Sequence, residues 1–245
     1  MISVLGTIFY ALIAFVVIVL FAIIGVVVFV VTAPFDKNRY AMQLFSLVFS
    51  WCFMKSCPLW RFDIEGRENM DKDKPYVVTC NHQSMLDITL LYVAIGCKWG
   101  KFVAKKEVYR IPFFGWVLWA RNDIAIDRGA SGAYTKVLSR GKACLKRGMS
   151  IFIFPEGTRS KDGEIHRFKE SAFSLAKQAD VEILPCVMNG PHDIFKGMLL
   201  RRTKLQVRIL PPIPLNEVRE LTSKELLQKV QTISEDKLRE MRNEK

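Results

Sequence analysis

The sequence predicts an α/β fold: a mixed, largely parallel sheet flanked by helices, preceded by an N-terminal hydrophobic arm of two helices. The first 35 residues, Met1 to Phe35, contain no charged side chain. After Lys55, short apolar runs alternate with amphipathic stretches, which is the pattern of β-α units. The 245 residues suffice for one such domain and its arm. We therefore predict a membrane-anchoring arm, 1–55, and an α/β domain, 56–245.

The arm is expected to contain two apolar helices joined by a turn at 33–39. Ile8–Val31 is uncharged, and as a helix it would be about 36 Å long, enough for the hydrocarbon core of a bilayer. Tyr40–Met54 is short for a span, and its aromatic residues suit the membrane interface. A signal peptide is a poor match, because no basic segment precedes the apolar run and no cleavage site follows it. A buried helix of a soluble core is disfavoured because it does not need 35 uncharged residues.

Two membrane topologies agree with this arm. The first helix spans the bilayer, with the basic body held in the cytoplasm by the positive-inside rule. Alternatively, the two helices form a hairpin in one leaflet, with both ends cytoplasmic. The net charge of +12 lies almost entirely after Lys55 and suits an anionic membrane surface or acidic lipid substrates. Nucleic acid is disfavoured as a partner because no known nucleic-acid motif is present.

The α/β domain is expected to alternate strands and helices. The predicted strands are Leu59–Ile64, Tyr76–Cys80, Lys101–Ala104, Asp123–Ile126, Ser150–Phe154, Glu182–Val187 and Lys204–Leu210. The predicted helices are Ser84–Ile95, Pro112–Ala120, Ala130–Arg147, Arg167–Gln178 and a last helix that starts at Thr222. Thr222 and Glu225 form a capping box at the start of that last helix. Pro211–Pro214 is a rigid connector leading into it.

The six cysteines are scattered along the chain and form no CxxC pair. Several lie in apolar runs, as Cys80 does at the end of Tyr76–Cys80. This pattern predicts buried free thiols in a reducing compartment and excludes a disulfide framework or a zinc site.

Polar residues that can bind a substrate follow four of the predicted strands. If these strands are parallel, their carboxyl ends share one edge of the sheet, where ligands bind in open α/β folds. The alternative is that loops are polar whatever their function. The residues at these positions are His82, Lys105, Lys106, Arg128, Glu156 and Arg159.

His82 and Asp87 can act as a catalytic pair. His82 is predicted in a loop and Asp87 in the first turn of the next helix, so the carboxylate can reach one imidazole nitrogen and leave the other as a base. A histidine near its reference pKa of about 6.5 is largely neutral at pH 7 and can accept a proton. On spacing alone, a structural hydrogen bond is the commoner explanation of a histidine near an aspartate.

The second cluster is Phe154–Ser160, which follows a strongly apolar strand. Gly157 permits close backbone approach, and Arg159 offers a planar set of donors suited to phosphate. Glu156 can hold a hydroxyl group or brace the arginine. The alternative is a tight turn with an exposed arginine.

Together, the two clusters resemble the glycerophospholipid acyltransferase family, with its Asn-His-x-x-x-x-Asp and Phe-Pro-Glu-Gly-Thr-Arg-Ser motifs. The resemblance covers 55–215 and is strongest to the bacterial 1-acyl-sn-glycerol-3-phosphate acyltransferases. One departure concerns a block that usually opens with glycine and carries a bulky apolar residue, where this chain has Asn122 and Ala125. Further matching segments are Val103–Glu107 before Pro112 and Gly115, Ile126–Arg128 and Ile183–Val187.

The resemblance implies acyl transfer from a thioester to the sn-2 hydroxyl of 1-acyl-glycerol 3-phosphate, giving phosphatidic acid. His82 would be the general base and Asp87 would orient it. The donor would be a thioester of acyl carrier protein or coenzyme A, with no metal or other cofactor. The enzyme would lie on the cytoplasmic face of the cell inner membrane. The residues implied to bind the glycerol phosphate are Lys105, Lys106, Arg128, Glu156, Gly157, Thr158 and Arg159.

Several alternatives stay open. The acceptor can be another lysophospholipid, glycerol 3-phosphate or a lyso-aminolipid. A lipid hydrolase is less favoured, because the chain has no Gly-x-Ser-x-Gly nucleophile motif. A membrane-binding protein that keeps the fold without catalysis is the remaining possibility. The sequence does not separate the two donors, the two topologies or the acyl-chain preferences.

Overall fold

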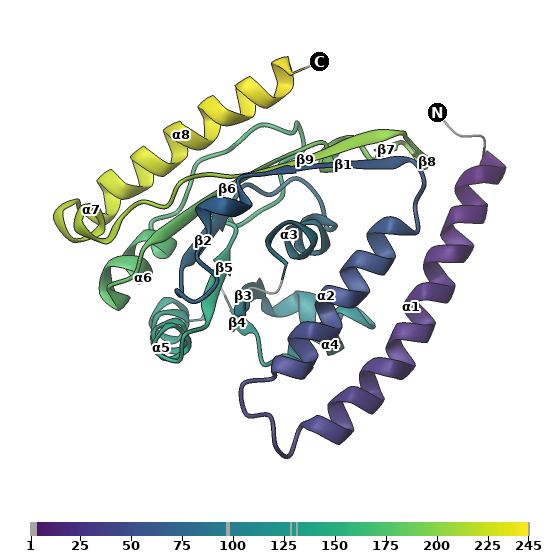
Figure 1. Cartoon of the computed structure of the whole chain (residues 1–245), viewed down its shortest axis with the longest axis horizontal. Helices are drawn as coiled ribbons and strands as arrows, with labels where there is room; N and C mark the ends of the chain where they lie inside the picture. Colours follow the sequence, from purple (N-terminus) through teal and green to yellow (C-terminus); the bar gives the residue numbers. More distant parts are fainter. Residues whose placement is uncertain (1–3, 97–98, 128, 131, 245) are drawn as a thin grey trace.

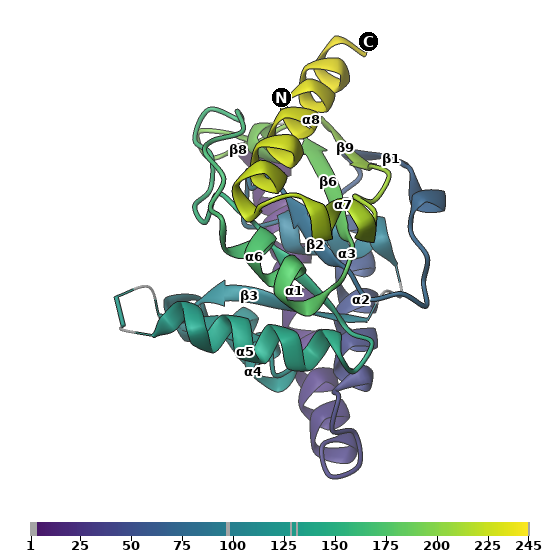
Figure 2. The same cartoon turned by 90° about the vertical axis from the view of Figure 1, so that its left-hand side faces the viewer.

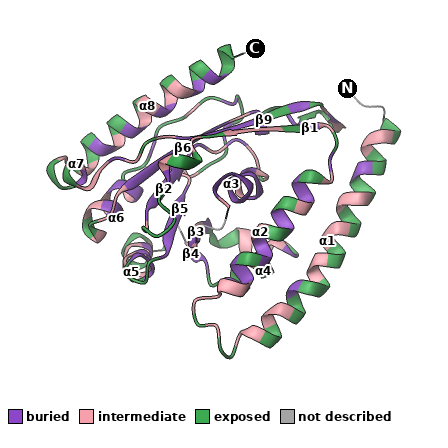
Figure 3. Ribbon diagram, viewed as in Figure 1, coloured by how far each residue is buried: buried purple, intermediate pink, exposed green. Residues whose placement is uncertain are grey.

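The computed structural model describes residues 4–96, 99–127, 129–130 and 132–244. The chain begins with a hairpin of two helices, α1 (Val4–Thr32) and α2 (Tyr40–Lys55). Helix α1 is outermost, and α2 lies between it and the rest of the molecule (Figure 1). By length and composition, α1 is apolar enough to cross a membrane. Much of its surface is exposed or only partly buried (Figure 3).

The centre of the molecule is a seven-stranded sheet of order β1-β9-β6-β2-β5-β3-β4. Strands β6, β2, β5, β3 and β4 run parallel to one another, and β1 runs parallel to β9. The β6–β9 pair of this sheet is antiparallel. This confirms the prediction of a mixed, largely parallel sheet. The strands are β1 (Trp60–Glu65), β2 (Val77–Cys80), β3 (Gly100–Lys105), β4 (Ile124–Ile126), β5 (Ser150–Ile153), β6 (Ile183–Asn189) and β9 (Thr203–Ile209).

Helices cover both faces of this sheet, which explains why its central strands are apolar on both sides. Val78 and Phe152 pack into the core on the side of α2 and α3, whereas Val77 and Ile151 pack on the side of α5, α6 and α8. The two layers are visible in Figures 1 and 2. The helices of the domain are α3 (Asp87–Ile95), α4 (Phe114–Ala120), α5 (Ala133–Leu145), α6 (Ser171–Ala179), α7 (Leu215–Glu220) and α8 (Ser223–Asn243).

The predicted elements are present, with ends that differ by a few residues. The capping box of Thr222 and Glu225 is formed at the start of α8. Helix α7 was not predicted, nor were the two-residue strands β7 (Phe195–Lys196) and β8 (Leu199–Leu200). Five of the six cysteines are described, all as free thiols, and Cys97 lies outside the described residues.

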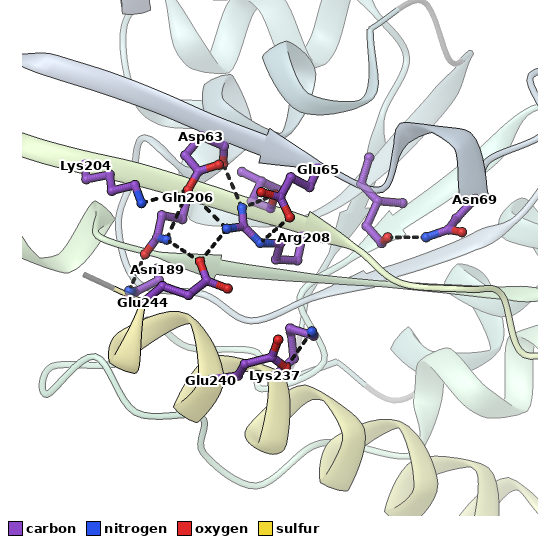
Figure 4. Close-up of polar contacts among 12 residues, drawn as sticks. Asp63, Glu65, Asn69, Asn189, Lys204, Gln206, Arg208, Lys237, Glu240 and Glu244 are labelled. Carbon is purple, nitrogen blue, oxygen red and sulfur yellow. Dashed lines mark hydrogen bonds and ion pairs between the residues drawn. The ribbon is translucent and has the colours of Figure 1, made fainter.

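A buried arginine joins the outer strands to the end of α8. Arg208 of β9 is 5% exposed, and its guanidinium bonds Asp63 of β1 at 3.1 Å and Glu244 at 2.6 Å (Figure 4). The same guanidinium holds the pKa of Asp63 well below its usual range. These ion pairs hold the end of α8 against the β1–β9 side of the sheet, opposite the edge at β4.

Candidate active site

The predicted pair of His82 and Asp87 is formed. His82 follows β2, and Asp87 is the first residue of α3. The Nδ1 atom of His82 lies 2.6 Å from Oδ2 of Asp87. The Asp87 side chain is fully buried, whereas 19% of the His82 side chain is exposed. A carboxylate at this nitrogen favours the tautomer protonated at Nδ1, which leaves Nε2 to accept a proton.

Backbone donors also hold the Asp87 carboxylate. Its Oδ2 accepts hydrogen bonds from the backbone N–H of Gln83 at 2.6 Å and of Ser84 at 2.8 Å. Hydrogen bonds to an ionised acceptor are stronger than neutral ones. They fold residues 83–86 into a turn over the start of α3, which explains why the helix begins at Asp87 and not at Ser84 as predicted.

The Phe154–Ser160 segment contacts His82 in several ways. The Phe154 ring stacks on the imidazole, with ring centroids 4.2 Å apart and planes inclined by 17°. The backbone N–H of Ser160 donates to the carbonyl oxygen of His82 at 2.7 Å. The backbone N–H of His82 donates to Oε1 of Glu156 at 2.9 Å. The two sequence clusters therefore meet at one histidine.

The sequence did not predict the contacts that the buried side chain of Glu156 makes. The residue is 4% exposed, and its two carboxylate oxygens accept from the backbone N–H groups of His82 and His166. Burial raises the pKa of Glu156 above its ordinary value. Both oxygens therefore hold the protein backbone, and the geometry supports a positioning role. Its predicted contact with the acceptor stays a prediction.

Asn81 is a further residue of the site whose role the sequence did not reveal. Its buried side chain donates from Nδ2 to the carbonyl oxygen of Met188 at 2.9 Å and accepts from the N–H of Met188 at 2.7 Å. The amide thus continues the pairing of β2 with β6 for one more step beyond Cys80. This anchors the residue directly before His82. The sequence indicated Asn81 only as the first residue of the Asn-His-x-x-x-x-Asp motif.

The loop after β5 carries the predicted glycine, threonine and arginine. Gly157 has a φ of +73°, a left-handed conformation that glycine adopts without steric cost. Thr158 and Arg159 are exposed. Within the described part of the chain, Arg159 has no ion-pair partner, so its donors are available to a ligand.

Lys105 and Lys106 lie where β3 ends, and both are exposed. The Nζ of Lys105 lies 3.4 Å from Glu107, and the Nζ of Lys106 lies 3.2 Å from Asp127. Arg128 lies outside the described residues. Because β2, β5, β3 and β4 are parallel neighbours, the two lysines, His82 and the 156–159 loop are at one edge of the sheet, as predicted.

The departure at Asn122 has a conformational explanation. Its φ is +57°, a left-handed conformation that glycine adopts freely and asparagine tolerates better than most residues. Its side-chain oxygen accepts from Arg140 at 2.8 Å. The local turn is therefore kept without glycine.

An apolar cavity lies beside this site, and a larger one adjoins it through Phe113 and Val117. The smaller, of about 70 Å³, is lined in part by Met85, Phe102 and Phe113. The Phe102 ring lies 6.2 Å from the Phe154 ring that stacks on His82. The larger, of about 340 Å³, lies between α1, α2 and α4. Phe113 lines both cavities and has a φ of +63° in a γ-turn closed by the N–H of Phe114 and the carbonyl of Pro112, a strained geometry.

The side chains of the other two histidines contact other carboxylates, although the backbone N–H of His166 donates to Glu156. His166 and Asp162 form an exposed pair, Nε2 to Oδ1 at 3.0 Å, and His192 lies beside Asp193. Among the described residues, no group of three or more His, Cys, Asp or Glu side chains is placed to bind a metal ion.

The chain resembles several acyltransferases along much of its length. It is 36% identical to the chloroplastic 1-acyl-sn-glycerol-3-phosphate acyltransferase LPAT1 of Arabidopsis thaliana over 65% of this chain and 44% of that protein. It is 33% identical to the 1-acyl-sn-glycerol-3-phosphate acyltransferase of Saccharomyces cerevisiae over 73% of this chain and 60% of that protein. The chain thus spans about half the length of the curated relatives that it matches.

The fold is shared with a solved structure. The 1-acyl-sn-glycerophosphate (LPA) acyltransferase PlsC of Thermotoga maritima superposes with a TM-score of 0.81 at 26% identity, over 98% of this chain and 96% of that chain. A family model described as Acyltransferase matches residues 61–189, more than half of the chain and the whole region around His82 and Glu156. The chain therefore belongs to the acyltransferase family.

Proposed function

We propose that the protein transfers a fatty acyl group from an acyl thioester to the sn-2 hydroxyl of 1-acyl-glycerol 3-phosphate, giving phosphatidic acid for phospholipid biosynthesis. The observation that carries this proposal is the 2.6 Å contact between His82 and the buried Asp87, beside an edge of exposed cations. Family membership and the names of the relatives point to the same reaction.

In the proposed mechanism, Nε2 of His82 removes the proton of the acceptor hydroxyl as its oxygen attacks the thioester carbonyl. An ester C–O bond forms, the C–S bond breaks, and the departing thiolate receives the proton from His82. Asp87 stabilises the imidazolium that forms between these two steps. General-base catalysis of this kind contributes about 10²–10⁴-fold to the rate. No acyl-enzyme and no metal ion take part in this scheme.

The exposed cations at the same edge suit the phosphate of the acceptor. An arginine can bind a phosphate through two parallel hydrogen bonds, and lysines add charge. The Arg159 side chain, without an ion-pair partner among the described residues, is the best placed of them. The residues proposed to hold the glycerol phosphate are Lys105, Lys106, Arg128, Gly157, Thr158 and Arg159, above the buried Glu156.

The apolar cavities beside the site are suited to an acyl chain. Phe102 lines the smaller cavity and its ring contacts Phe154, which stacks on His82, so a chain that runs from His82 past Phe154 would reach this cavity. The donor thioester is carried by acyl carrier protein or by coenzyme A.

We place the protein at the cell inner membrane, with the catalytic domain on the cytoplasmic face and the α1–α2 hairpin in one leaflet. Helix α1 touches the domain at both ends. The N–H of Leu200 in β8 donates to Oγ1 of Thr7, and the Phe29 ring packs on Trp119 of α4 with ring centroids 5.2 Å apart. These contacts are about 33 Å apart along the helix. A spanning α1 would carry parts of the domain to opposite faces of the roughly 30 Å hydrocarbon core.

The experiment that tests the function is acyl transfer in vesicles, with several lyso-lipid acceptors crossed with acyl carrier protein and coenzyme A donors. We expect phosphatidic acid from 1-acyl-glycerol 3-phosphate, and a loss of about 10²–10⁴-fold in kcat for His82→Ala. The control is His192→Ala, whose imidazole lies beside Asp193 and forms no hydrogen bond or ion pair with His82, Asp87 or Glu156 among the described residues. Release of free fatty acid without an acceptor would indicate a hydrolase. Wild-type transfer by His82→Ala would refute the catalytic assignment.

A further inference from the structure

The hairpin of β7 and β8 presents an apolar tip to solvent. Phe195 pairs with Leu200 and Lys196 with Leu199, so the turn consists of Gly197 and Met198. Gly197 has a φ of +62°, which a two-residue hairpin turn commonly requires. Met198 is 90% exposed and Phe195 is 53% exposed. Met198 lies at the apex of this tight turn, so the rest of the described chain does not bury its side chain.

Two cations lie near the tip in the sequence, Lys196 directly before the turn and Arg202 two residues after β8. Lys196 and Arg202 are exposed, and neither forms an ion pair with any residue in the described ranges. The neighbouring Arg201 is paired with Asp193 at 3.1 Å. The hairpin and the residues directly after it therefore combine an exposed methionine with two cations that have no ion-pair partner among the described residues.

The base of the hairpin is fixed against the outermost helix. Leu200 is fully buried, and its N–H donates to Oγ1 of Thr7 in α1. On the same end of α1, Leu5 is 78% exposed and Phe9 is 66% exposed. The hairpin also follows the carboxyl end of β6, which is the edge of the sheet that carries His82. Figure 1 shows β8 close to the N-terminal end of α1.

We propose that the β7–β8 hairpin is a separate contact with the surface of an anionic bilayer, with Met198 among the lipid headgroups and Lys196 and Arg202 on anionic phosphates. The proposal rests on the membrane location given under Proposed function. An apolar tip with flanking cations matches the charge and polarity of that interface, and it continues the apolar surface of α1. A tip of this size is small for a stable protein interface. The contact would hold the catalytic edge toward the layer that supplies the acceptor.

The test measures the depth of a spin label in reconstituted vesicles of the full chain. One variant carries the label at Met198→Cys, and the matched control carries it at Lys224→Cys, an exposed site on α8, both in a background without reactive native cysteines. We expect the label at position 198 to be shielded from a water-soluble relaxation agent and accessible to oxygen in vesicles that contain phosphatidylglycerol. The label at position 224 should stay accessible to the water-soluble agent.

The charges are tested with the double variant Lys196→Glu, Arg202→Glu. Each cation near an anionic surface is expected to strengthen the contact about fivefold. The label at position 198 should therefore lose its shielding in this variant. In the labelled chain that keeps Lys196 and Arg202, the label should lose its shielding only when phosphatidylcholine replaces the anionic lipid.

Equal exposure to water at positions 198 and 224 in anionic vesicles would overturn the proposal. A label at position 198 that is shielded in detergent solution, before any bilayer is present, would indicate a protein contact and would overturn it too. Acyl transfer is measured on the same vesicles. Active enzyme with an exposed label would refute the hairpin contact alone, whereas inactive enzyme would refute the proposed function.

Discussion

At the scale of single residues, the site depends on how the backbone of His82 is held. Asp87 holds the imidazole of His82. Glu156 accepts from the backbone N–H of His82, and the N–H of Ser160 donates to the carbonyl oxygen of His82. The sequence predicted the pair because one motif contains both residues. It placed Glu156 among the substrate residues but did not predict its two backbone hydrogen bonds, because the fold that buries this carboxylate is not visible in a local motif.

Glu156→Gln is expected to lower kcat and to leave the KM for the acceptor nearly unchanged. The amide keeps the volume of the side chain but can accept only through one oxygen, so one of the backbone N–H groups of His82 and His166 loses its partner. A hydrogen bond to a charged group is worth about 1.5–3 kcal/mol, which corresponds to a loss of roughly 10–100-fold. The measurement is the split between kcat and KM in vesicle assays.

The control for this variant is Glu164→Gln, on the same loop, where the carboxylate is exposed and pairs with Arg242. Glu164→Gln should retain wild-type kinetics. If Glu156→Gln raised the KM for the acceptor and spared kcat, Glu156 would bind substrate, as the sequence first indicated.

At the scale of secondary structure, the amino-terminal half of β3 is completed by side chains. Strand β4 pairs only with the other half of β3, so Gly100 and Phe102 need other partners on that side. The N–H of Gly100 donates to Gln43 at 2.7 Å, its carbonyl accepts from Arg121 at 3.0 Å, and the N–H of Phe102 donates to Asp123 at 3.0 Å. This cluster joins α2 and the end of α4 to the sheet.

Lys101 lies inside the same cluster. It is 2% exposed, and its Nζ donates to the carbonyl oxygens of Arg121 and of Asn38 in the turn between α1 and α2. Burial lowers the pKa of Lys101 to about 8. The turn of the hairpin is therefore connected to β3 through a lysine that loses its charge more readily than an exposed one.

Lys101 makes stability depend on pH in a defined window. Between about pH 8 and 10.5, the folded chain has released the proton of Lys101 while the unfolded chain keeps it, so the free energy of unfolding rises with pH, by up to about 1.4 kcal/mol per pH unit. Lys101→Met should lack this increase. The measurement is unfolding in detergent across the window, and Lys224→Met is the exposed control. Parallel pH profiles for wild type and Lys101→Met would contradict the prediction.

The sequence predicted the elements better than their arrangement. Apolar runs and periodicity identified the strands of the main sheet, because both faces of the central strands are buried. The strand order and the reversed direction of β9 against β6 depend on long-range contacts, which no local pattern records. Strands β7 and β8 contain two residues each, too few for a periodic pattern, so the hairpin of Met198 was not predicted.

At the scale of the whole molecule, the position of α1 limits how the protein can lie in a membrane. The sequence left a spanning helix and a one-leaflet hairpin open, because length and hydropathy are the same in both. The contacts of Thr7 with Leu200 and of Phe29 with Trp119 hold both ends of α1 to one domain, and they support the proposed one-leaflet hairpin. Trp119 and its neighbour Trp116 are 65% and 60% exposed, and exposed tryptophans of this kind favour the membrane interface.

Spin labels at Leu5→Cys, Val16→Cys and Val27→Cys will test the one-leaflet arrangement. These residues are exposed and 11 positions apart, so they lie on nearly the same face of α1. For a spanning helix, the label at position 16 would be deepest, with the other two about 16 Å away toward opposite surfaces. For the proposed hairpin, all three labels should lie between the midplane and the same surface, because the domain contacts both ends of the helix. A single maximum of depth at position 16, with both ends at opposite surfaces, would show that α1 separates from β8 or α4 in the bilayer.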